Sequence, residues 1–325
     1  MSAAVRAGTC ALALAVAACA PVYWIDWQSP IGRTHPLAGK IFDVRADGFI
    51  SPRELVDRLA ARRWVLLGER HDNPDHHALQ ARLVRALAAA GRRPALGFEM
   101  LSTDQSAALA RHLARAPKDA AGLGTAVGWQ DTGWPDWADY QPIARAALDA
   151  GLPIVATNLS RAALDAMRDR GVAGLGPAVQ RELGLDQPLP PAMRAALAGE
   201  IRDSHCGHAP AAALDRMVDV QWARDARMAE SLARAGRRDG AILIAGSGHV
   251  RRDRGVPVHL VRREPGATVA SLAFLEIEAK GTTPGDYLDA GERLLPYDYV
   301  WFTPRIDDVD PCEKFKKSLE RLKKS

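Results

Sequence analysis

The sequence predicts an α/β fold in which helices flank a central, mostly parallel sheet. Four short apolar runs, at 64–68, 95–99, 153–157 and 241–246, have the length and composition of buried strands. Helical patterns separate the first three runs, and this alternation is typical of parallel strands joined by right-handed crossovers. Between 160 and 236 only helical patterns occur, which predicts a smaller all-helical subdomain inserted over the carboxyl edge of the strands.

Capping residues and chain breakers place the individual elements in order. A helix is expected after Ser51, because Ser51 can cap it, Pro52 suits its first position and Glu54 closes a capping box. Asp75 is expected to cap the next helix. The remaining expected segments are helices at 76–90, 104–116 and 138–150, a Gly/Trp-rich loop at 122–137, and strands at 257–261, 271–279 and 297–303, the last two open to an antiparallel edge position.

The N-terminal residues have the pattern of a bacterial lipoprotein leader. Arg6 supplies a positive charge, and the apolar run at 10–18 is shorter than the roughly 20 residues of a membrane span. Residues 16–19 (VAAC) match a lipobox, so cleavage before Cys19 and acylation of its thiol and amine are expected. An ordinary cleaved signal peptide is the alternative. Ala20, in place of an inner-membrane retention aspartate, favours the outer membrane, facing the periplasm or the surface.

Charge and composition divide the rest of the chain. The expected regions are a signal peptide at 1–18, a lipidated tether at 19–40, an α/β domain at 41–305 and a charged tail at 306–325. The net charge of +4 comes from Arg6 and from the tail, which carries six basic and three acidic residues from Asp310 onward. The neutral body argues against nucleic acid as a partner, because phosphate binding requires a concentrated basic face. The tail is expected to form a short amphipathic helix, with contact to anionic lipid as an alternative.

Two of the four cysteines remain after processing. Cys10 is removed with the leader and Cys19 is lipidated, which leaves Cys206 and Cys312. These two can pair in an oxidising compartment, although sequence alone does not place them close together. No CxxC motif occurs, which argues against a thiolate zinc site.

Each of the four apolar runs stops on a polar, chemically reactive segment. The strand ends would carry Glu69, His71, Glu99, Asn158 and His249. Ligands of open parallel α/β sheets bind beyond the carboxyl ends of the strands, so these residues are expected to face one pocket. There Glu69 would act as a general base or ligand, while His71, Glu99 and His249 would bind a divalent metal or polarise a carbonyl. The expected metal ligands are Glu69, His71 and His249.

Structural roles for some of these residues stay open. His76 and His77 adjoin in the first turn of a helix and cannot point the same way, so at least one is expected at the surface or behind the pocket. Glu99 can instead form a salt bridge to Arg70 or Arg93, since a buried carboxylate requires a partner.

An apolar stripe at helical spacing runs from Leu214 to Leu232 and also carries Gln221 and Asp225. A buried Asp225 needs a partner, such as Arg224 or an arginine elsewhere. The loop at 128–140 groups four aromatic residues, either as plain core or as the apolar wall of a pocket for a flat ligand: Trp129, Trp134, Trp137 and Tyr140. Three arginines can bind carboxylates or propionates, although each alone suits a surface position: Arg251, Arg252 and Arg254.

Five motifs occur in order along 50–262: LGERHDNPDHH, GFEM, GWPDWADYQPI, SHCGHAP with QWARDARMAESL, and AGSGHVRRDRGVP. Together they resemble the ChaN-like haem-binding uptake lipoproteins, which are grouped with the Tiki, TraB and erythromycin-esterase proteins. The resemblance implies a large parallel α/β domain with a smaller helical one, and haem held near their junction, within one chain or across a homodimer interface. For relatives such as Tiki it implies metal-dependent hydrolysis by the strand-tip acids and histidines.

The resemblance also implies which side chains hold haem. A proximal His or Tyr suits ferric haem. His205 or His208 in SHCGHAP is the expected axial ligand, with Tyr140 next, Trp134 as an aromatic wall and Arg251 on the propionates.

The sequence therefore predicts a lipid-anchored envelope protein that binds haem in iron acquisition, in exchange with a haem-uptake receptor. The alternative is a metal-dependent hydrolase of the Tiki/erythromycin-esterase type that uses the strand-tip Glu/His cluster. A third reading is an envelope scaffold whose pocket has lost its chemistry. The aromatic loop favours a flat apolar ligand over a peptide.

Overall fold

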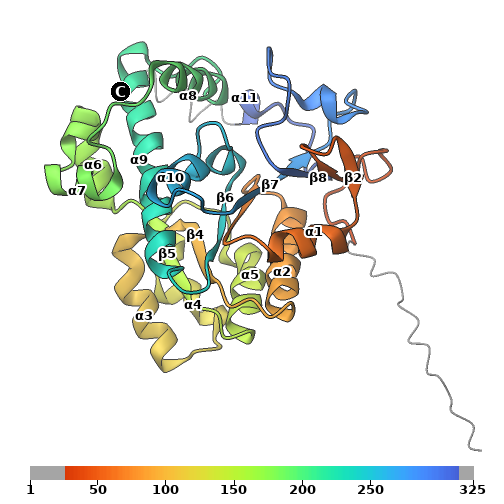
Figure 1. The fold of residues 1–325 in the computed structure, drawn as a ribbon, viewed down its shortest axis with the longest axis horizontal. Coiled ribbons are helices and arrows are strands. Elements are labelled where there is room, and N and C mark those ends of the chain that lie inside the picture. Colours follow the sequence, from red (N-terminus) through yellow and green to blue (C-terminus); the bar gives the residue numbers. More distant parts are fainter. Residues whose placement is uncertain (1–25, 315–325) are drawn as a thin grey trace, which may run out of the picture.

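The computed structural model describes residues 26–314, which contain one eight-stranded mixed sheet (Figure 1). The strand order is β2-β1-β8-β7-β3-β6-β4-β5. The strands are β1 (Ile41–Asp43), β2 (Gly48–Ile50), β3 (Trp64–Glu69), β4 (Ala95–Ser102), β5 (Ile154–Asn158), β6 (Ala241–Gly246), β7 (Val269–Glu276) and β8 (Tyr299–Thr303). The six strands from β8 to β5 run parallel, and the hairpin β1–β2 is antiparallel to β8. The predicted α/β fold with a mostly parallel sheet is confirmed.

Some expectations for the C-terminal third are wrong. The run at 257–261 lies in helix α10 (Val256–Arg263), where Pro257 occupies the first turn and the buried Val256 and Leu260 are one turn apart. The strands expected at 271–279 and 297–303 are β7 and β8, which pair parallel, with both strands inside the sheet. The antiparallel edge is instead the β1–β2 hairpin, whose strands of three residues each are too short to show a periodic pattern.

Helices cover both faces of the sheet (Figure 1). The helices other than α10 are α1 (Pro52–Ala60), α2 (Pro74–Ala89), α3 (Ser106–Arg115), α4 (Ala120–Ala126), α5 (Trp137–Asp149), α6 (Arg161–Arg170), α7 (Pro177–Leu183), α8 (Pro191–Ser204), α9 (Ala211–Ala235) and α11 (Pro311–Lys314). Helices α1, α2 and α5 pack on one face, while α9 and α10 pack on the other. Helix α1 begins with the expected capping box at Ser51.

Strand β3 shows how the two layers bury a continuous apolar run. Val65 and Leu67 belong to the core shared with α1 and α2, whereas Trp64 and Leu66 belong to the core shared with α9 and α10. Side chains alternate between the two faces of a strand, so a strand covered on both faces has no polar alternation. A Cβ at Gly68 would lie 2.3 Å from Val250 Cγ2 and 3.0 Å from the Cα of Ser247, so glycine allows the turn after β6 to approach β3.

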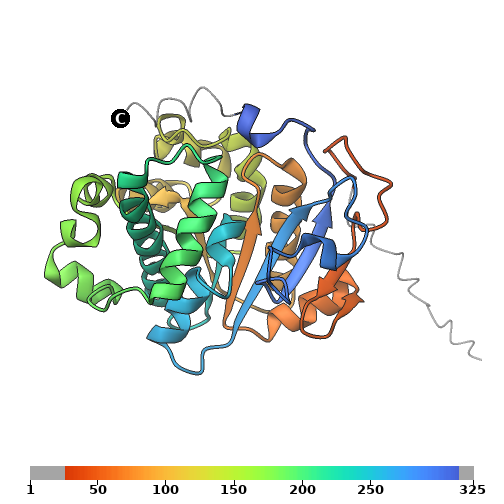
Figure 2. The ribbon, with the colours of Figure 1, turned by 90° about the horizontal axis from the view of Figure 1, so that it is seen from above.

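The elements described between 161 and 235 are all helical, as predicted for the insertion. They are α6 to α9 and the 3-10 turn η3 (Gly171–Gly174), and they enclose a core of their own around Met167, Leu197 and Trp222. Helix α9 also reaches the sheet through Met228 and Leu232, so one helix joins the subdomain to the sheet. Figure 2 shows these green helices grouped at one side of the sheet.

The start of α2 differs in its cap. Asn73, not Asp75, caps the helix, because its side chain accepts hydrogen bonds from the backbone NH groups of Asp75 and His76. Asp75 instead accepts hydrogen bonds from the backbone NH groups of Gln28 at 2.7 Å and Ser29 at 3.0 Å. The expected loop at 122–137 contains part of α4 and the 3-10 turn η2 (Trp129–Asp131).

The segment before β1 packs on the domain from Trp27 onward, rather than forming a tether as far as residue 40. The signal peptide, the lipobox with Cys19 and the tail beyond residue 314 lie outside the described residues. From 26 to 314, no helix combines the length and apolar character needed to cross a membrane.

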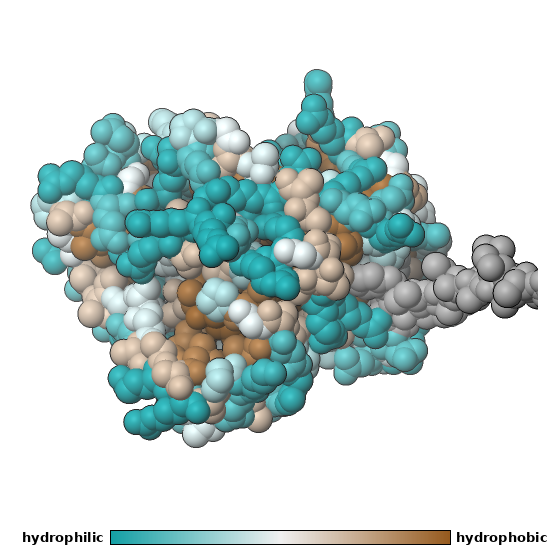
Figure 3. All heavy atoms as spheres, turned by 60° about the horizontal axis from the view of Figure 1, so that its bottom comes forward, coloured by the Kyte–Doolittle hydropathy of each residue, from teal (hydrophilic) through white to brown (hydrophobic). Residues whose placement is uncertain are grey.

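The underside of the molecule is largely polar, with apolar residues gathered in one hollow (Figure 3).

Candidate functional site

The strand ends meet as the sequence predicted. Strand β6 lies between β3 and β4, with β5 beyond β4. His249, in the 3-10 turn η4 (Ser247–Val250) after β6, has its Nε2 3.2 Å from Glu99 Oε1, and His71 Nε2 lies 3.9 Å from Glu99 Oε2. Asn158 Nδ2 donates a hydrogen bond to the backbone carbonyl of Glu99 at 2.9 Å, and Glu69 Oε1 lies 2.9 Å from His71 Nδ1. All five predicted strand-end residues therefore belong to one cluster.

Three ring side chains surround Glu69. The hydroxyl of Tyr140 donates a hydrogen bond to Oε1 at 2.6 Å, His71 Nδ1 lies near the same oxygen, and His77 Nε2 lies 3.5 Å from Oε2. Burial alone would raise the pKa of Glu69, but the charge of His77 and the hydrogen bond from His71 hold this pKa far below its usual range. Glu69 is therefore a buried carboxylate that remains ionised.

The two adjacent histidines of α2 are both buried and face different partners, so neither lies at the surface, and His76 is the one that lies behind the pocket. The ring of His77 lies 4.3 Å from that of Tyr140, measured between centroids. His76 Nδ1 accepts a hydrogen bond from the backbone NH of Arg70 at 2.9 Å, and its Nε2 lies 2.8 Å from Thr303 Oγ1. Burial, assisted by the charge of His77, lowers the pKa of His76 to about 3. His76 is a neutral structural link between α2 and β8.

Glu99 receives hydrogen bonds from two other elements. The Arg224 guanidinium of α9 donates to Oε1, and the backbone NH of Gly246 donates to Oε2 at 2.7 Å. Burial alone would raise the pKa of Glu99, but the charges of His249 and Arg224 hold it well below its usual range. Arg224 is 125 positions away in the chain, and the sequence did not connect it with Glu99.

Asp225 and His249 form a buried pair. His249 Nδ1 lies 2.6 Å from Asp225 Oδ1, and Gln221 Nε2 lies 3.2 Å from the same nitrogen. Burial opposes the charge of His249, but Glu99 and Asp225 raise its pKa to about 9. Burial raises the pKa of Asp225 to about 6, against the effect of His249. The partner of Asp225 is this histidine rather than the expected arginine.

The two halves of the cluster meet at Gly246. A Cβ there would lie 2.9 Å from His71 Nε2 and 3.6 Å from Glu99 Oε2, so the glycine at the end of β6 makes room for His71. The His71 side chain is 33% exposed, whereas those of Glu69, Glu99 and His249 are at most 7% exposed. Burial lowers the pKa of His71, but the two carboxylates of Glu69 and Glu99 raise it by a larger amount, so the pKa of His71 is raised overall. His71 is the acid–base group of this cluster that solvent reaches.

The expected metal ligands do not form a metal site. Among residues 26–314, no group of three or more His, Cys, Asp or Glu side chains is arranged to hold a metal ion. Glu69 and His71 face each other, and His249 is enclosed by Glu99 and Asp225. In this arrangement the cluster is held together by hydrogen bonds and buried ion pairs.

Arginines expected to meet Glu99 or an anionic ligand are engaged elsewhere. Arg70 pairs with Asp72 and Glu276, and Arg93 donates to the carbonyl of Ala88. Arg251 lies between Asp253 and Asp289. Arg252 pairs with Asp298, and Arg254 pairs with Glu200 and Asp253. The Arg251 side chain is only 8% exposed. In this arrangement the Arg251 guanidinium is held by two carboxylates of its own chain.

A cavity of about 820 Å³ lies beside the cluster, lined by α6, α8, α9 and the loop before α9. Its lining residues are Arg161, Leu164, Asp165, Arg168, Asp169, Ile201, His205, Pro210, Ala213, Arg216, Met217, Val220, Gln221 and Arg224. Gln221 and Arg224 also contact His249 and Glu99, so the cavity reaches the edge of the buried network. Its volume is in the range of ligand pockets, about 300–1,000 Å³.

Of the expected haem ligands, His205 lines this cavity. Its Nδ1 lies 2.7 Å from the backbone carbonyl oxygen of Ile201, so Nδ1 is a proton donor, and the lone pair of the neutral ring is on Nε2. His208 is not part of the lining. Tyr140 is fully buried and its hydroxyl is committed to Glu69, so it does not face the cavity.

Trp134 also belongs elsewhere. Its ring lies 4.8 Å from the ring of His71, measured between centroids, and it is not part of the cavity lining. Trp129 and Trp137 pack with Tyr140 in the core below the sheet. The aromatic loop therefore covers the strand-end cluster rather than the cavity.

Four arginines line the cavity, a role that the sequence did not predict for them. Arg161 and Arg168 pair with Asp165, and Arg224 pairs with Glu99. Within the described part of the chain, Arg216 has no hydrogen-bond or ion-pair partner. Arg161 and Arg168 are seven residues apart on α6, and Arg216 and Arg224 are eight apart on α9, which places each pair on one face of its helix. That spacing was the available sequence signal.

The family of haem-binding uptake proteins of the Tiki superfamily, ChaN, matches residues 55–260. This chain belongs to that family. The match includes both the strand-end cluster and the cavity wall on α6, α8 and α9. No curated protein matches the chain.

Solved structures similar to this ChaN-family chain include one that shares its fold. The structure of cofacial haem binding to ChaN of Campylobacter jejuni has a TM-score of 0.62 and 21% sequence identity, covering 80% of this chain and 95% of that one. The type III effector HopBA1 has a TM-score of 0.41 and 14% identity, covering 77% and 92%. A mutant of the erythromycin esterase EreC in its open conformation has a TM-score of 0.41 and 15% identity, covering 83% of each chain.

Proposed function

We propose that this ChaN-family protein binds haem in the cavity between α6, α8 and α9, as a lipid-anchored envelope protein in iron acquisition. The observation that carries the proposal is the position of His205, which lines the cavity with Nδ1 bound to the carbonyl of Ile201. A backbone acceptor on one ring nitrogen fixes the tautomer and leaves the other nitrogen as a metal ligand. Membership of a haem-binding uptake family supports the same conclusion.

The other side chains of the cavity fit haem as well. Leu164, Met217 and Val220 offer apolar contact for a flat macrocycle, and Arg216 offers an unpaired guanidinium for a carboxylate. When bound, the haem iron supplies a coordination site for an imidazole nitrogen. The protein's own part is to hold the His205 ring, exclude water with apolar residues and neutralise the carboxylates. These are properties of capture rather than of turnover.

The cellular part of the proposal depends on the leader and on the cysteines. The lipobox ending in Cys19 supports acylation, and Ala20 supports attachment to the outer membrane. The disulfide between Cys206 and Cys312 supports a compartment outside the cytoplasm, because disulfides persist in oxidising environments. From that position the protein would exchange haem with an uptake receptor, as a monomer or as a homodimer.

Replacement of His205 tests the proposal directly. Titration of the full chain with haemin is expected to give a saturable Soret band, and His205→Ala is expected to weaken binding roughly tenfold or more, about 1.4 kcal/mol. His208→Ala is the matched control, because this neighbouring histidine does not line the cavity and should bind haemin as the parent does. Absence of a saturable band from the parent protein at stoichiometric haemin would refute haem binding.

The unpaired guanidinium of Arg216 predicts that the cavity prefers ligands with free carboxylates. A charge-assisted hydrogen bond contributes about 1.5–3 kcal/mol, so Arg216→Ala is expected to weaken haemin binding by about tenfold or more. The dimethyl ester of haemin should bind the parent and the variant equally, because it lacks the anionic group. Arg238→Ala removes an arginine whose side chain is 93% exposed and should leave both affinities unchanged. An equal loss of affinity for the acid and the ester on Arg216→Ala would contradict this assignment.

The accessible position of His71 favours hydrolysis as a second candidate function. His71 is the solvent-reached member of the cluster, its Nδ1 is held by Glu69, and its raised pKa suits donation of a proton to a leaving group. Turnover of an ester substrate that is lost in both His71→Ala and Glu69→Gln would support it. No turnover on ester and peptide panels by the parent protein would remove it.

A further inference from the structure

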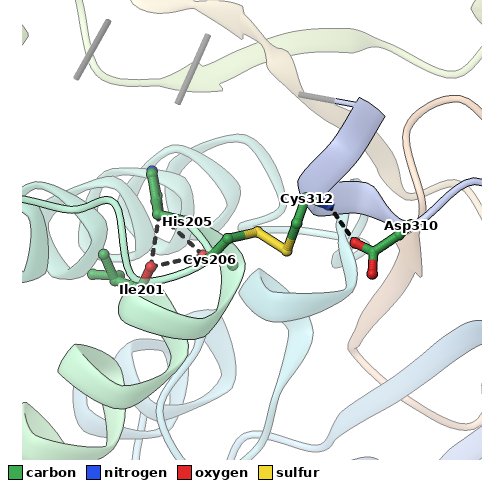
Figure 4. Close-up of a disulfide and its surroundings, with 6 residues drawn as sticks. Ile201, His205, Cys206, Asp310 and Cys312 are labelled. Atoms are coloured by element: carbon green, nitrogen blue, oxygen red, sulfur yellow. Dashed lines mark hydrogen bonds between the residues drawn. A yellow bond between two sulfur atoms is a disulfide. The ribbon is translucent and has the colours of Figure 1, made fainter. Parts of the chain in front are cut away.

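A disulfide fastens the loop that carries His205 to the C-terminal end of the described chain (Figure 4). Cys206, the neighbour of His205, is bonded to Cys312 over a sequence separation of 106 residues, with a Cα–Cα distance of 5.8 Å. We propose that Cys206 and Cys312 are positioning residues for His205, whose imidazole the disulfide holds against the haem cavity. This inference rests on the proposed haem-binding function and adds to it the element that fixes the ligand.

The loop around His205 is tightly turned. Helix α8 ends at Ser204, and His205 is its C-cap. The backbone NH and the ring Nδ1 of His205 both approach the carbonyl of Ile201, at 3.1 and 2.7 Å. The next two residues, Cys206 and Gly207, have φ values of +53° and +70°. This left-handed conformation is uncommon for a residue other than glycine and persists where the surroundings hold it. The disulfide is a covalent constraint at that same residue.

Packing alone holds this loop weakly. Ile201 is the last buried residue of α8, and Val218 is the next buried one along the chain among those described. Every described residue between them is at least partly exposed, including His205 itself. Segments with few buried contacts open locally at low free-energy cost. A covalent bond inside such a segment therefore has a large influence on where its side chains lie.

The other end of the bond is attached to the α/β body. The backbone NH of Cys312 donates to Asp310 Oδ1 at 2.7 Å, which fixes the start of α11 (Figure 4). Lys314 pairs with Asp307 at 2.6 Å and with Asp72 at 2.8 Å. Asp72 follows His71 in the loop after β3. The disulfide thus connects the loop after β3, through Lys314 and α11, to the loop that lines the cavity. His205 is the residue next to Cys206, at the cavity end of this connection.

The test compares haemin binding of the full chain with that of the double variant Cys206→Ser/Cys312→Ser, which leaves no thiol at either position to bind iron. We expect roughly tenfold weaker haemin binding, faster haem loss and a ferric absorption and EPR spectrum with altered axial ligation. In a His205→Ala background the same two substitutions should change haemin affinity no further. An equal loss in both backgrounds, or unchanged affinity and spectrum in the double variant, would overturn the proposal.

A backbone variant keeps the test decisive even where loss of the disulfide unfolds the chain. Gly207→Ala strains the turn at φ +70° while both cysteines remain, and Gly184→Ala imposes a similar strain at φ +68°, at the end of α7. Neither added Cβ has a neighbour within 4 Å, so the two substitutions are matched. Gly207→Ala should weaken haemin binding and Gly184→Ala should not, whereas equal affinities would refute positioning. A parent protein that gives no saturable Soret band refutes haem binding itself, which is a distinct result.

Discussion

Glu99→Ala is expected to lower the free energy of unfolding by about 3–5 kcal/mol, because it removes one partner from a buried ion-pair network. Glu99 is 1% exposed and accepts hydrogen bonds from Arg224 and from the backbone NH of Gly246, with His249 beside it. Without the carboxylate, two cations are left close together in a site that water reaches poorly. Urea unfolding followed by circular dichroism measures the change, through the midpoint at constant slope.

Glu264→Ala is the matched control for this substitution. Glu264 pairs with Arg63 at 3.3 Å, but its side chain is 43% exposed. Exposed pairs contribute at most about 1 kcal/mol, so this variant should unfold close to the parent. Similar decreases in the free energy of unfolding for Glu99→Ala and Glu264→Ala would show that burial does not determine how much the ion-pair network contributes to stability.

The free energy of unfolding is expected to fall by about 3 kcal/mol as the pH rises through the range from 6.5 to 9. Glu99 and Asp225 raise the pKa of His249 from 6.5 to about 9 against the effect of burial, so the folded protein binds a proton in this range that the unfolded chain releases. The resulting stabilisation is fully present below pH 6.5 and is lost as the pH passes 9. His71, whose pKa is also raised, acts in the same direction.

Two histidine variants separate this effect from general alkaline damage. His249→Gln should abolish most of the slope of unfolding free energy against pH, whatever its stability at neutral pH. His259 is also buried, but burial lowers its pKa to about 3, so His259→Gln should leave the alkaline slope unchanged. A flat profile for the parent protein, or a slope that persists in His249→Gln, would contradict the assignment.

Local sequence patterns were sufficient for the parts of the fold in which each element buries its own apolar run. The run at 64–67 is covered on both faces and was recognised as a strand, and the change of pattern after 160 was recognised as a helical insertion. The strand prediction at 257–261 was wrong, because five apolar-rich residues fit a strand or a buried helical turn equally well. The hairpin at 41–50 was not predicted, because three-residue strands carry too little periodicity.

The candidate site was predictable only for those residues that lie directly after the carboxyl ends of the parallel strands. Glu69, Glu99 and His249 converge because parallel strands bring their carboxyl ends to one edge. The partners contributed by α9 could not be assigned, because the pairing of Arg224 with Glu99 depends on how a helix 125 residues away crosses the sheet. Likewise, the exposure of His205 and the burial of Tyr140 depend on packing, which the residue types alone do not specify.

The bond between Cys206 and Cys312 has a practical consequence for anyone producing this protein. A recombinant chain made in the reducing cytoplasm of an expression host carries two free thiols at these positions, whereas an exported chain is oxidised. Samples of identical sequence can then differ in their affinity for porphyrin according to their production route. Quantifying free thiols in each batch is therefore a necessary step before binding constants from different preparations are compared.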